Sequence, residues 1–135
     1  MPTRKTVAVI TSAPEKASAI AGAFSEDRCN LLILVKDTEG YDKVLAAIKR
    51  KNKKSAVELH DCMRDGCWEA DAIIIDVKKE EESAVADSIK EVAIQKIVVS
   101  ISEECDKNLQ QLLPYSKVKT LSEVPASFMH IIEDE

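Results

Sequence analysis

Apolar segments of strand length alternate with segments of helical periodicity along most of the chain. Residues 5–10 (KTVAVI) are rich in β-branched side chains, which favours a buried strand. Residues 31–36 (LLILVK) lack polar alternation, as expected of a strand that is covered on both faces. Between them, residues 15–25 place apolar side chains at helical spacing. The start of the chain is therefore predicted to form a strand–helix–strand unit.

The same alternation continues toward the C-terminus. Further strands are predicted over residues 56–59, 72–77, 95–101 and 117–121. Further helices are predicted from residue 41 onward, over 83–93 and over 106–113, with a brief helix or turn over 64–69 whose Trp68 packs inward. Such regular alternation implies right-handed crossovers and a parallel sheet. We therefore expect one α/β domain over residues 1–135, a doubly wound, Rossmann-like sheet of about six strands with helices on both faces and a ligand crevice at the carboxyl ends of the first and fourth strands.

Composition narrows the class of protein further. Hydrophobic residues make up 45% and charged residues 32%, which indicates a globular chain and not a disordered one. The net charge of −5 gives no broad basic surface, so we expect no nucleic-acid partner. The longest apolar stretch, residues 31–35, is too short to span a bilayer, and no signal peptide is evident. We expect a cytoplasmic protein without a membrane partner.

Cysteine and histidine positions offer little chemistry. The four cysteines are Cys29, Cys62, Cys67 and Cys105. Their spacing matches no zinc ribbon or redox CxxC motif, so reduced and mostly buried thiols are expected, with no metal. His60 could join Cys62 and Cys67 as a three-ligand alternative, or pair with Cys62 as a nucleophile and its base. Because no third orienting group can be identified, we expect no catalytic residue.

Four segments make the chain resemble the N-terminal domain of the deazaflavin-dependent NADP oxidoreductases. They are VAVI at residues 7–10, ADAIIIDV at 70–77, KIVVSIS at 96–102 and LQQLLPYSKVKTLSEVPA at 109–126. The last is the most specific, because an LLP segment followed by KV and then VPA is typical of that family. The resemblance implies a domain that binds NADP. In that family a following segment helps to form the deazaflavin site, so we expect an isolated cofactor half ending near Glu135.

The loop after the first strand departs from that family. A dinucleotide site uses glycines there for the tight turn, for the close approach of the backbone to the diphosphate, and for helix–strand packing. At those places this chain has Thr11, Ser12, Pro14 and Ala17.

Residues 12–15 (SAPE) instead read as a capping box, which is simply a good helix start. Ser12 would be the N-cap, and its hydroxyl would accept a hydrogen bond from the backbone N–H of Glu15. The Glu15 carboxylate would in turn accept a hydrogen bond from the backbone N–H of Ser12. Within the same turn, Ala13 precedes Pro14, which has no amide to offer a phosphate. Glu15 also places a negative charge at the positive end of the helix. A carboxylate about 4 Å from a phosphate charge costs roughly 1 kcal/mol in water and about 4 kcal/mol near a protein surface.

Two further crevice positions follow the second and fourth strands. Lys36 stands where NADP enzymes place a basic side chain for the 2′-phosphate, although the hydroxyl residue expected before it is Val35. Lys36 is equally compatible with a plain strand end. Asp76 could be a buried carboxylate with a raised pKa, but bonding to backbone amides or to Lys78 is favoured.

Three functions remain open. The favoured one is a degenerate Rossmann domain, a pseudoenzyme without redox activity or cofactor, that acts through protein contacts or an unidentified small ligand. The second is an NADP-binding oxidoreductase domain with an atypical phosphate loop, and the third is a coenzyme A-binding domain, for which residues 13–18 (APEKAS) give slight support. We expect a homo-oligomer or a partner protein, with residues 124–132, including Phe128, Met129 and Ile131, as the contact element. The basic run 49–54 reads as a solvated helix end, with a partner surface as the alternative.

Overall fold

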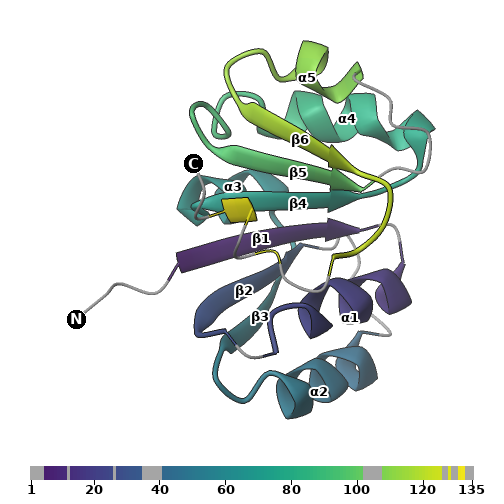
Figure 1. Cartoon of the computed structure of the whole chain (residues 1–135), viewed down its shortest axis with the longest axis vertical. Coiled ribbons are helices and arrows are strands. Elements are labelled where there is room, and N and C mark those ends of the chain that lie inside the picture. The colour runs from purple at the N-terminus through teal and green to yellow at the C-terminus, as the bar shows by residue number, and fades with distance from the viewer. Residues whose placement is uncertain are drawn as a thin grey trace.

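Six parallel strands form a single sheet in the order β3-β2-β1-β4-β5-β6 (Figure 1). The computed structural model describes residues 5–11, 13–25, 27–34, 41–101, 108–125, 128, 131 and 132. The strands are β1 (Lys5–Thr11), β2 (Cys29–Leu34), β3 (Ala56–His60), β4 (Ala72–Asp76), β5 (Ile97–Ile101) and β6 (Lys117–Leu121). Chain order reverses between β1 and β4, which is the switch point of a doubly wound sheet. The expected Rossmann-like α/β fold is confirmed.

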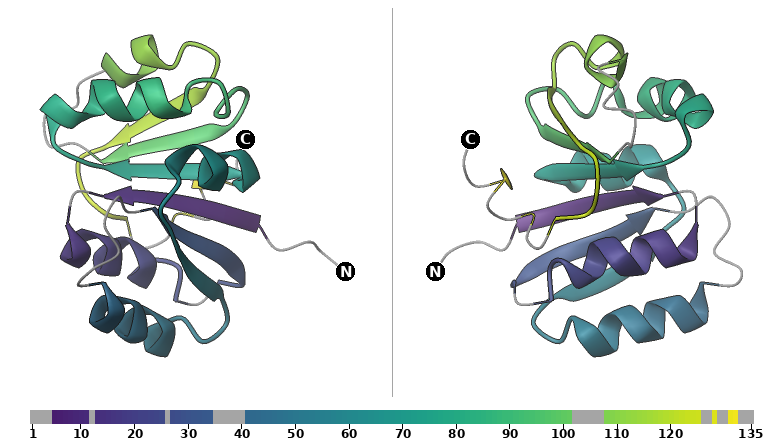
Figure 2. Two further views of the ribbon diagram at one scale, coloured as in Figure 1. Left: turned by 180° about the vertical axis from the view of Figure 1, so that it is seen from behind. Right: turned by 45° about the vertical axis from the view of Figure 1, so that its right-hand side comes forward.

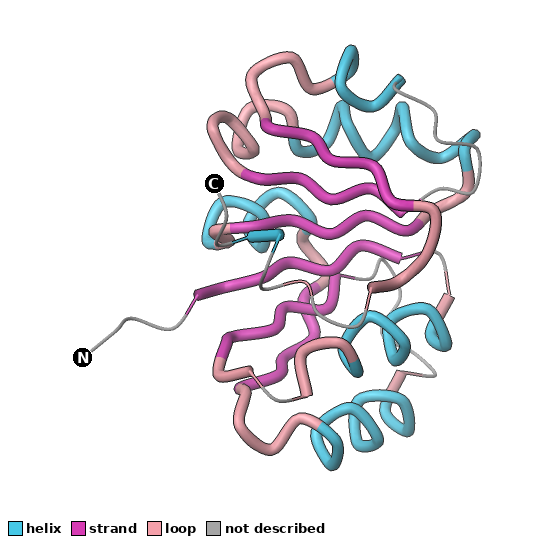
Figure 3. Tube along the Cα trace, in the orientation of Figure 1, coloured by secondary structure: helices cyan, strands magenta, loops and turns pink. Residues whose placement is uncertain are grey.

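Helices alternate with the strands along the chain (Figure 3). They are α1 (Pro14–Gly22), α2 (Asp42–Lys51), α3 (Met63–Glu69), α4 (Lys79–Ile89) and α5 (Asn108–Leu112). Helices α1 and α2 cover one face of the sheet, and α3, α4 and α5 cover the other (Figure 2). None of the helices in the described part of the chain has the length and apolar character needed to span a bilayer.

The two faces have separate hydrophobic cores because successive side chains of a strand point to opposite sides. In β1, Val7 and Val9 pack toward α1 and α2, whereas Ala8 and Ile10 pack toward α3 and α4. This two-sided burial is why the central strands read as continuous apolar runs in the sequence.

The segment after β6 returns to the α1 face of the sheet. Phe128 is fully buried there and stacks on Phe24, with ring centroids 5.3 Å apart and planes 12° apart. Ile132 is also buried in this core. The prediction that this segment is the contact element for another chain is wrong for these two side chains, because the domain's own α1 face already covers them. Met129 lies outside the described residues.

Helix α3 differs most from expectation. Trp68 was predicted to pack inward, but it is 70% exposed. In this helix of 7 residues, Gly66 and Cys67 take the buried positions, and a Cβ on Gly66 would lie 2.4 Å from Cδ2 of Leu34. A side chain at position 66 would therefore force the buried Leu34 side chain to move, which favours glycine there, and Trp68 is left on the outer side. There Lys96 lies 6.0 Å from the Trp68 ring, and its Nζ donates hydrogen bonds to the carbonyls of Cys67 and Trp68.

Helix α4 begins and ends four residues earlier than its apolar pattern suggested. Three glutamates in its first turn are favoured by the positive end of the helix dipole. The buried Val92 and Ala93, which extended the apolar pattern, lie in the connection to β5. In that connection Gln95 has a positive φ of 64°, a conformation that does not continue a helix.

Candidate functional site

The carboxyl ends of β1 and β4 meet at the switch point, where the sequence predicted a ligand crevice. Thr11 and Asp76, the last residues of these strands, are direct register partners. Helix α1 begins three residues after Thr11, so its N-terminus lies at the same edge of the sheet. This is the position at which doubly wound domains hold a ligand.

Helix α1 starts one residue later than predicted. Its N-cap is Ala13, in an extended conformation with φ −151° and ψ 147°, and no side chain among the described residues makes a capping hydrogen bond to the helix start. The predicted capping box is therefore wrong, and Glu15 is the second helical residue instead of the third. The physical reason is Pro14, whose fixed φ suits the first helical position and moves the N-cap to the preceding residue. Ser12 lies outside the described residues.

Even without a capping box, few backbone N–H groups at the start of α1 are left to bind a phosphate. Pro14 has no N–H, and the amides of Lys16 and Ala17 both donate to the carbonyl of Ala13, at 3.2 and 3.3 Å. The Thr11 hydroxyl donates to the same carbonyl at 3.1 Å. Glu15 is exposed in the first turn, so its carboxylate stands near the helix end that would otherwise attract an anion.

Asp76 is held by an ion pair with Lys16. Its Oδ1 lies 3.4 Å from Lys16 Nζ, and the two side chains are 14% and 38% exposed. The favoured prediction, a bond to backbone amides or to Lys78, is not what the structure shows. Lys78 is the exposed N-cap of α4, which leaves toward the opposite face of the sheet, whereas the first turn of α1 begins beside the end of β4. A lysine ammonium thus lies where β1, α1 and β4 converge.

Tyr41 is a residue of this edge that the sequence reasoning used only as a helix marker. It is the N-cap of α2, and its side chain lies close enough to those of Thr11 and Glu15 for both to affect its pKa. Burial raises the pKa of the Tyr41 phenol, the neighbouring Thr11 hydroxyl opposes that rise, and the negative charge of Glu15 adds to it. A tyrosine directly before a helix gives no local signal of this contact, because the contact joins segments thirty residues apart.

The remaining candidates do not extend the crevice. Lys36 lies outside the described residues, so its predicted role stays a prediction. His60 Nε2 lies 3.4 Å from Oε2 of Glu58 on the same strand. Cys62 is exposed but Cys67 is buried, and burial raises the pKa of the Cys67 thiol to about 12. Within the described ranges, no three His, Cys, Asp or Glu side chains come together as metal ligands.

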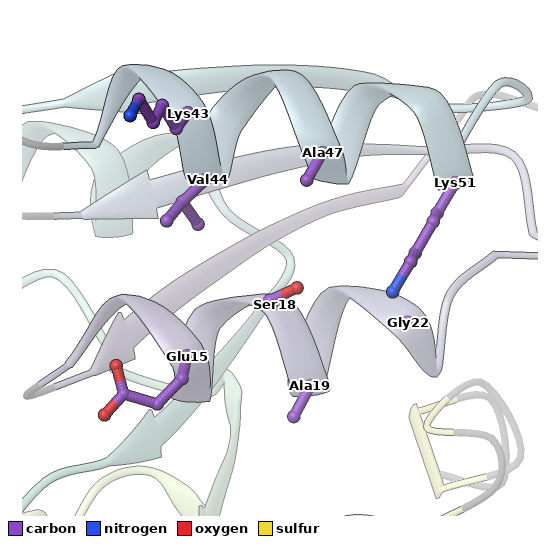
Figure 4. A pocket seen from close by; sticks show the side chains of 8 residues that line it. All are labelled: Glu15, Ser18, Ala19, Gly22, Lys43, Val44, Ala47 and Lys51. Atoms are coloured by element: carbon purple, nitrogen blue, oxygen red, sulfur yellow. The ribbon is translucent and has the colours of Figure 1, made fainter.

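A groove of about 580 Å³ runs between α1 and α2 on the outer side of the domain (Figure 4). Helix α1 contributes Glu15, Ser18, Ala19 and Gly22, and helix α2 contributes Lys43, Val44, Ala47 and Lys51. Figure 4 shows Lys51 reaching across the groove toward Gly22. The groove begins at the first turn of α1, where Glu15 stands, and runs along the outer helical layer to Gly22.

No protein-family model matches the chain, and no curated protein matches it in sequence. Solved structures do match in fold. Lactate dehydrogenase from Eimeria maxima, solved with NADH and oxamate, superimposes with a TM-score of 0.71 at 12% identity, over 90% of this chain and 44% of that one. A pyrroline-5-carboxylate reductase from Coxiella burnetii gives 0.67 at 16% identity, over 93% and 46%.

An imine reductase from Myxococcus stipitatus in complex with NAD⁺ gives a TM-score of 0.66 at 14% identity, over 87% of this chain and 40% of that one. The chain thus spans less than half the length of each of these three structures. Likeness at such low identity shows the fold alone. The chain has the Rossmann-type fold found in dehydrogenases and reductases that have been solved with NAD⁺ or NADH.

Proposed function

We propose that this domain is a Rossmann module without redox activity of its own, which acts through protein contacts instead of carrying a dinucleotide. The observation that carries the proposal is the Lys16–Asp76 ion pair at 3.4 Å, at the convergence of β1, α1 and β4. In doubly wound domains a diphosphate lies against the N-terminus of the first helix. Here the ion pair between the Lys16 and Asp76 side chains already occupies that edge.

The residues present do not fit a dinucleotide diphosphate. Such a group needs free backbone N–H donors and a close approach of the backbone. Pro14 supplies no donor, the amide of Lys16 is engaged by Ala13, and the Glu15 carboxylate repels an anion. Lys16 would also have to leave Asp76, whose side chain is 14% exposed, before it could bind a phosphate. Leaving a mostly buried carboxylate without its partner is unfavourable.

The alternative is an NADP-binding oxidoreductase domain with an atypical loop, related to the deazaflavin-dependent enzymes. The strand order and the position of α1 beside the switch point favour it, as does a lysine at that edge. Under this alternative, Lys16 exchanges Asp76 for a phosphate.

Isothermal titration calorimetry separates these readings. We expect no saturable heat with NADPH, NADH or coenzyme A at millimolar concentration. Saturable NADPH binding would refute the proposal and favour the oxidoreductase domain. Saturation by coenzyme A alone would favour a coenzyme A-binding domain.

A second experiment tests the physical reason. The variant Ser12→Gly, Pro14→Gly, Glu15→Gln, Ala17→Gly adds one backbone N–H at position 14, lets the backbone approach a ligand more closely and removes the negative charge. We expect it to gain measurable nucleotide affinity and to lose some stability, since glycine is unfavourable within helices. Glu69→Gln, which removes one carboxylate at the other end of the sheet, is the matched control and should gain nothing. If the loop variant also gains nothing, the loop does not explain the lack of binding.

A further inference from the structure

Basic side chains gather where α2 leads into β3, at the lower left of Figure 1. The last turn of α2 holds three of them, whereas no other helix in the described part of the chain has a basic residue in its last turn. The two residues after Asn52 are basic as well, and Arg28 lies between two residues that hydrogen-bond with the same connection. We call this group the basic corner. It consists of six exposed residues, Arg28, Lys49, Arg50, Lys51, Lys53 and Lys54.

Buried polar contacts hold the backbone that carries the basic corner. Asn52 interrupts the basic run because it faces inward, where it is 1% exposed and its Nδ2 donates to the carbonyl of Ala21 at 2.7 Å. The Ser55 hydroxyl donates to the carbonyl of Asp27 at 2.7 Å and accepts from the backbone N–H of Cys29 at 3.2 Å. The cations are therefore presented from a fixed scaffold, which lowers the entropy that is lost when a partner binds.

Few acidic side chains accompany these cations. Asp27, which is half-buried, is the one carboxylate within residues 27–29 and 49–55, and Glu26 before it lies outside the described residues. Glu58 on β3 lies on the other face of the sheet, because the residues on either side of it pack toward α2. Glu15 and Asp42 lie in the first turns of α1 and α2, at the far ends of these helices. The whole chain has 24 acidic and 19 basic residues, so the basic corner is opposite in sign to the protein.

A cluster of like charges suits an anionic partner, and its surroundings favour a short acidic segment over a nucleic acid or a membrane. An extended polyanion would face a protein whose net charge is −5, whereas a short segment meets only the charges within a Debye length of about 8 Å. Single-stranded nucleic acids and membrane surfaces also engage exposed aromatic or apolar side chains. The large hydrophobic side chains that are exposed in the described part of the chain precede β4, β5 and β6, in the other half of the sheet, and are Trp68, Ile94 and Tyr115.

We propose that the basic corner binds a short segment of another protein that is rich in aspartate and glutamate. Because Lys51 reaches across the α1–α2 groove toward Gly22 (Figure 4), the segment meets chiefly Lys49, Arg50 and Lys53. The proposal names the partner of the protein contact proposed above and rests on that function. Because the basic corner shares no residue with the loop at 11–17, the peptide titration described below and the nucleotide titration can fail independently.

Fluorescence anisotropy of a labelled peptide of alternating glutamate and glycine, titrated with the whole chain, tests the contact. We expect saturable binding at low ionic strength, and weaker binding as salt is added, because exposed charges are screened. Lys49→Gln with Arg50→Gln and Lys53→Gln should weaken binding by about tenfold, since each exposed charge pair contributes modestly. The same variant should keep an unfolding midpoint in urea close to that of the parent. It loses favourable interactions with the helix dipole but also loses repulsion between like charges.

A matched variant removes the same kinds of charge elsewhere. Arg64→Gln with Lys78→Gln and Lys90→Gln changes exposed residues in and beside α3 and α4, and it should bind the peptide as the parent does. A peptide of alternating glutamine and glycine should not bind. Absence of saturable binding at low ionic strength overturns the proposal, as does binding that the basic-corner variant retains or that both triple variants lose equally. Tighter binding of a uridine oligonucleotide of equal charge, or of phosphatidylserine vesicles, at the same ionic strength overturns it too.

Discussion

Replacing Phe128 with alanine should lower the free energy of unfolding by about 3–5 kcal/mol, as is typical for a buried phenylalanine. Phe128 is fully buried, and its ring stacks on that of Phe24 at 5.3 Å. An aromatic pair of this kind accounts for about 0.5–1.5 kcal/mol of that loss. Because domains of this size are stable by about 5–15 kcal/mol, the variant should fold but unfold at clearly lower urea concentration.

Urea unfolding followed by far-ultraviolet circular dichroism is the suitable assay, since the single tryptophan is already 70% exposed in the folded state. The loss should be the same at low and high protein concentration, because Phe128 packs within its own domain. Tyr115→Ala, at a side chain that is 73% exposed, is the matched control and should change stability by less than about 0.5 kcal/mol. A loss below about 1 kcal/mol for Phe128→Ala, or one that depends on protein concentration, would refute this account of the C-terminal segment.

Two further predictions concern α3 and the helices around it. In Gly66→Ala the new Cβ would lie 2.4 Å from Cδ2 of the buried Leu34, and such overpacking lowers the free energy of unfolding by about 1–3 kcal/mol. The higher helix propensity of alanine offsets roughly 1 kcal/mol of this loss. Gly22→Ala meets nothing within 4 Å and should be neutral or stabilising in the same urea assay; equal effects of the two substitutions would contradict the packing argument. Stability should also fall as pH rises from about 9 toward about 12, because the Cys67 thiol, with an ordinary pKa of 9.0, keeps its proton up to about 12 when folded. Burial lowers the pKa of Lys96, and this has the opposite effect on stability. The measurement is therefore the difference in stability between the parent protein and Cys67→Ala. The stability of Cys67→Ala should fall less over this pH range.

The location of the candidate site was predictable from the sequence, but its contacts were not. Thr11 and Asp76 end apolar strands, and the carboxyl ends of parallel strands share one edge, so periodicity and topology rules were sufficient to bring them together. The partner of Asp76 was predicted wrongly because Lys78, near in sequence, leaves the edge with α4, whereas Lys16 on α1 reaches it. Tyr41 was missed for the same reason, since it comes near Thr11 and Glu15 only once α2 packs beside α1.

The sequence by itself determined the six strands and the layer architecture, because long apolar runs must be buried on both faces and strand–helix alternation permits few topologies. Only the tertiary structure decided which side chains of the short or terminal segments are inside. Trp68 is exposed because Gly66 and Cys67 take the inner side of α3, and Phe128 is buried because the chain turns back over α1. Such choices depend on the space that neighbouring elements leave, and the local pattern of a few residues does not contain that information.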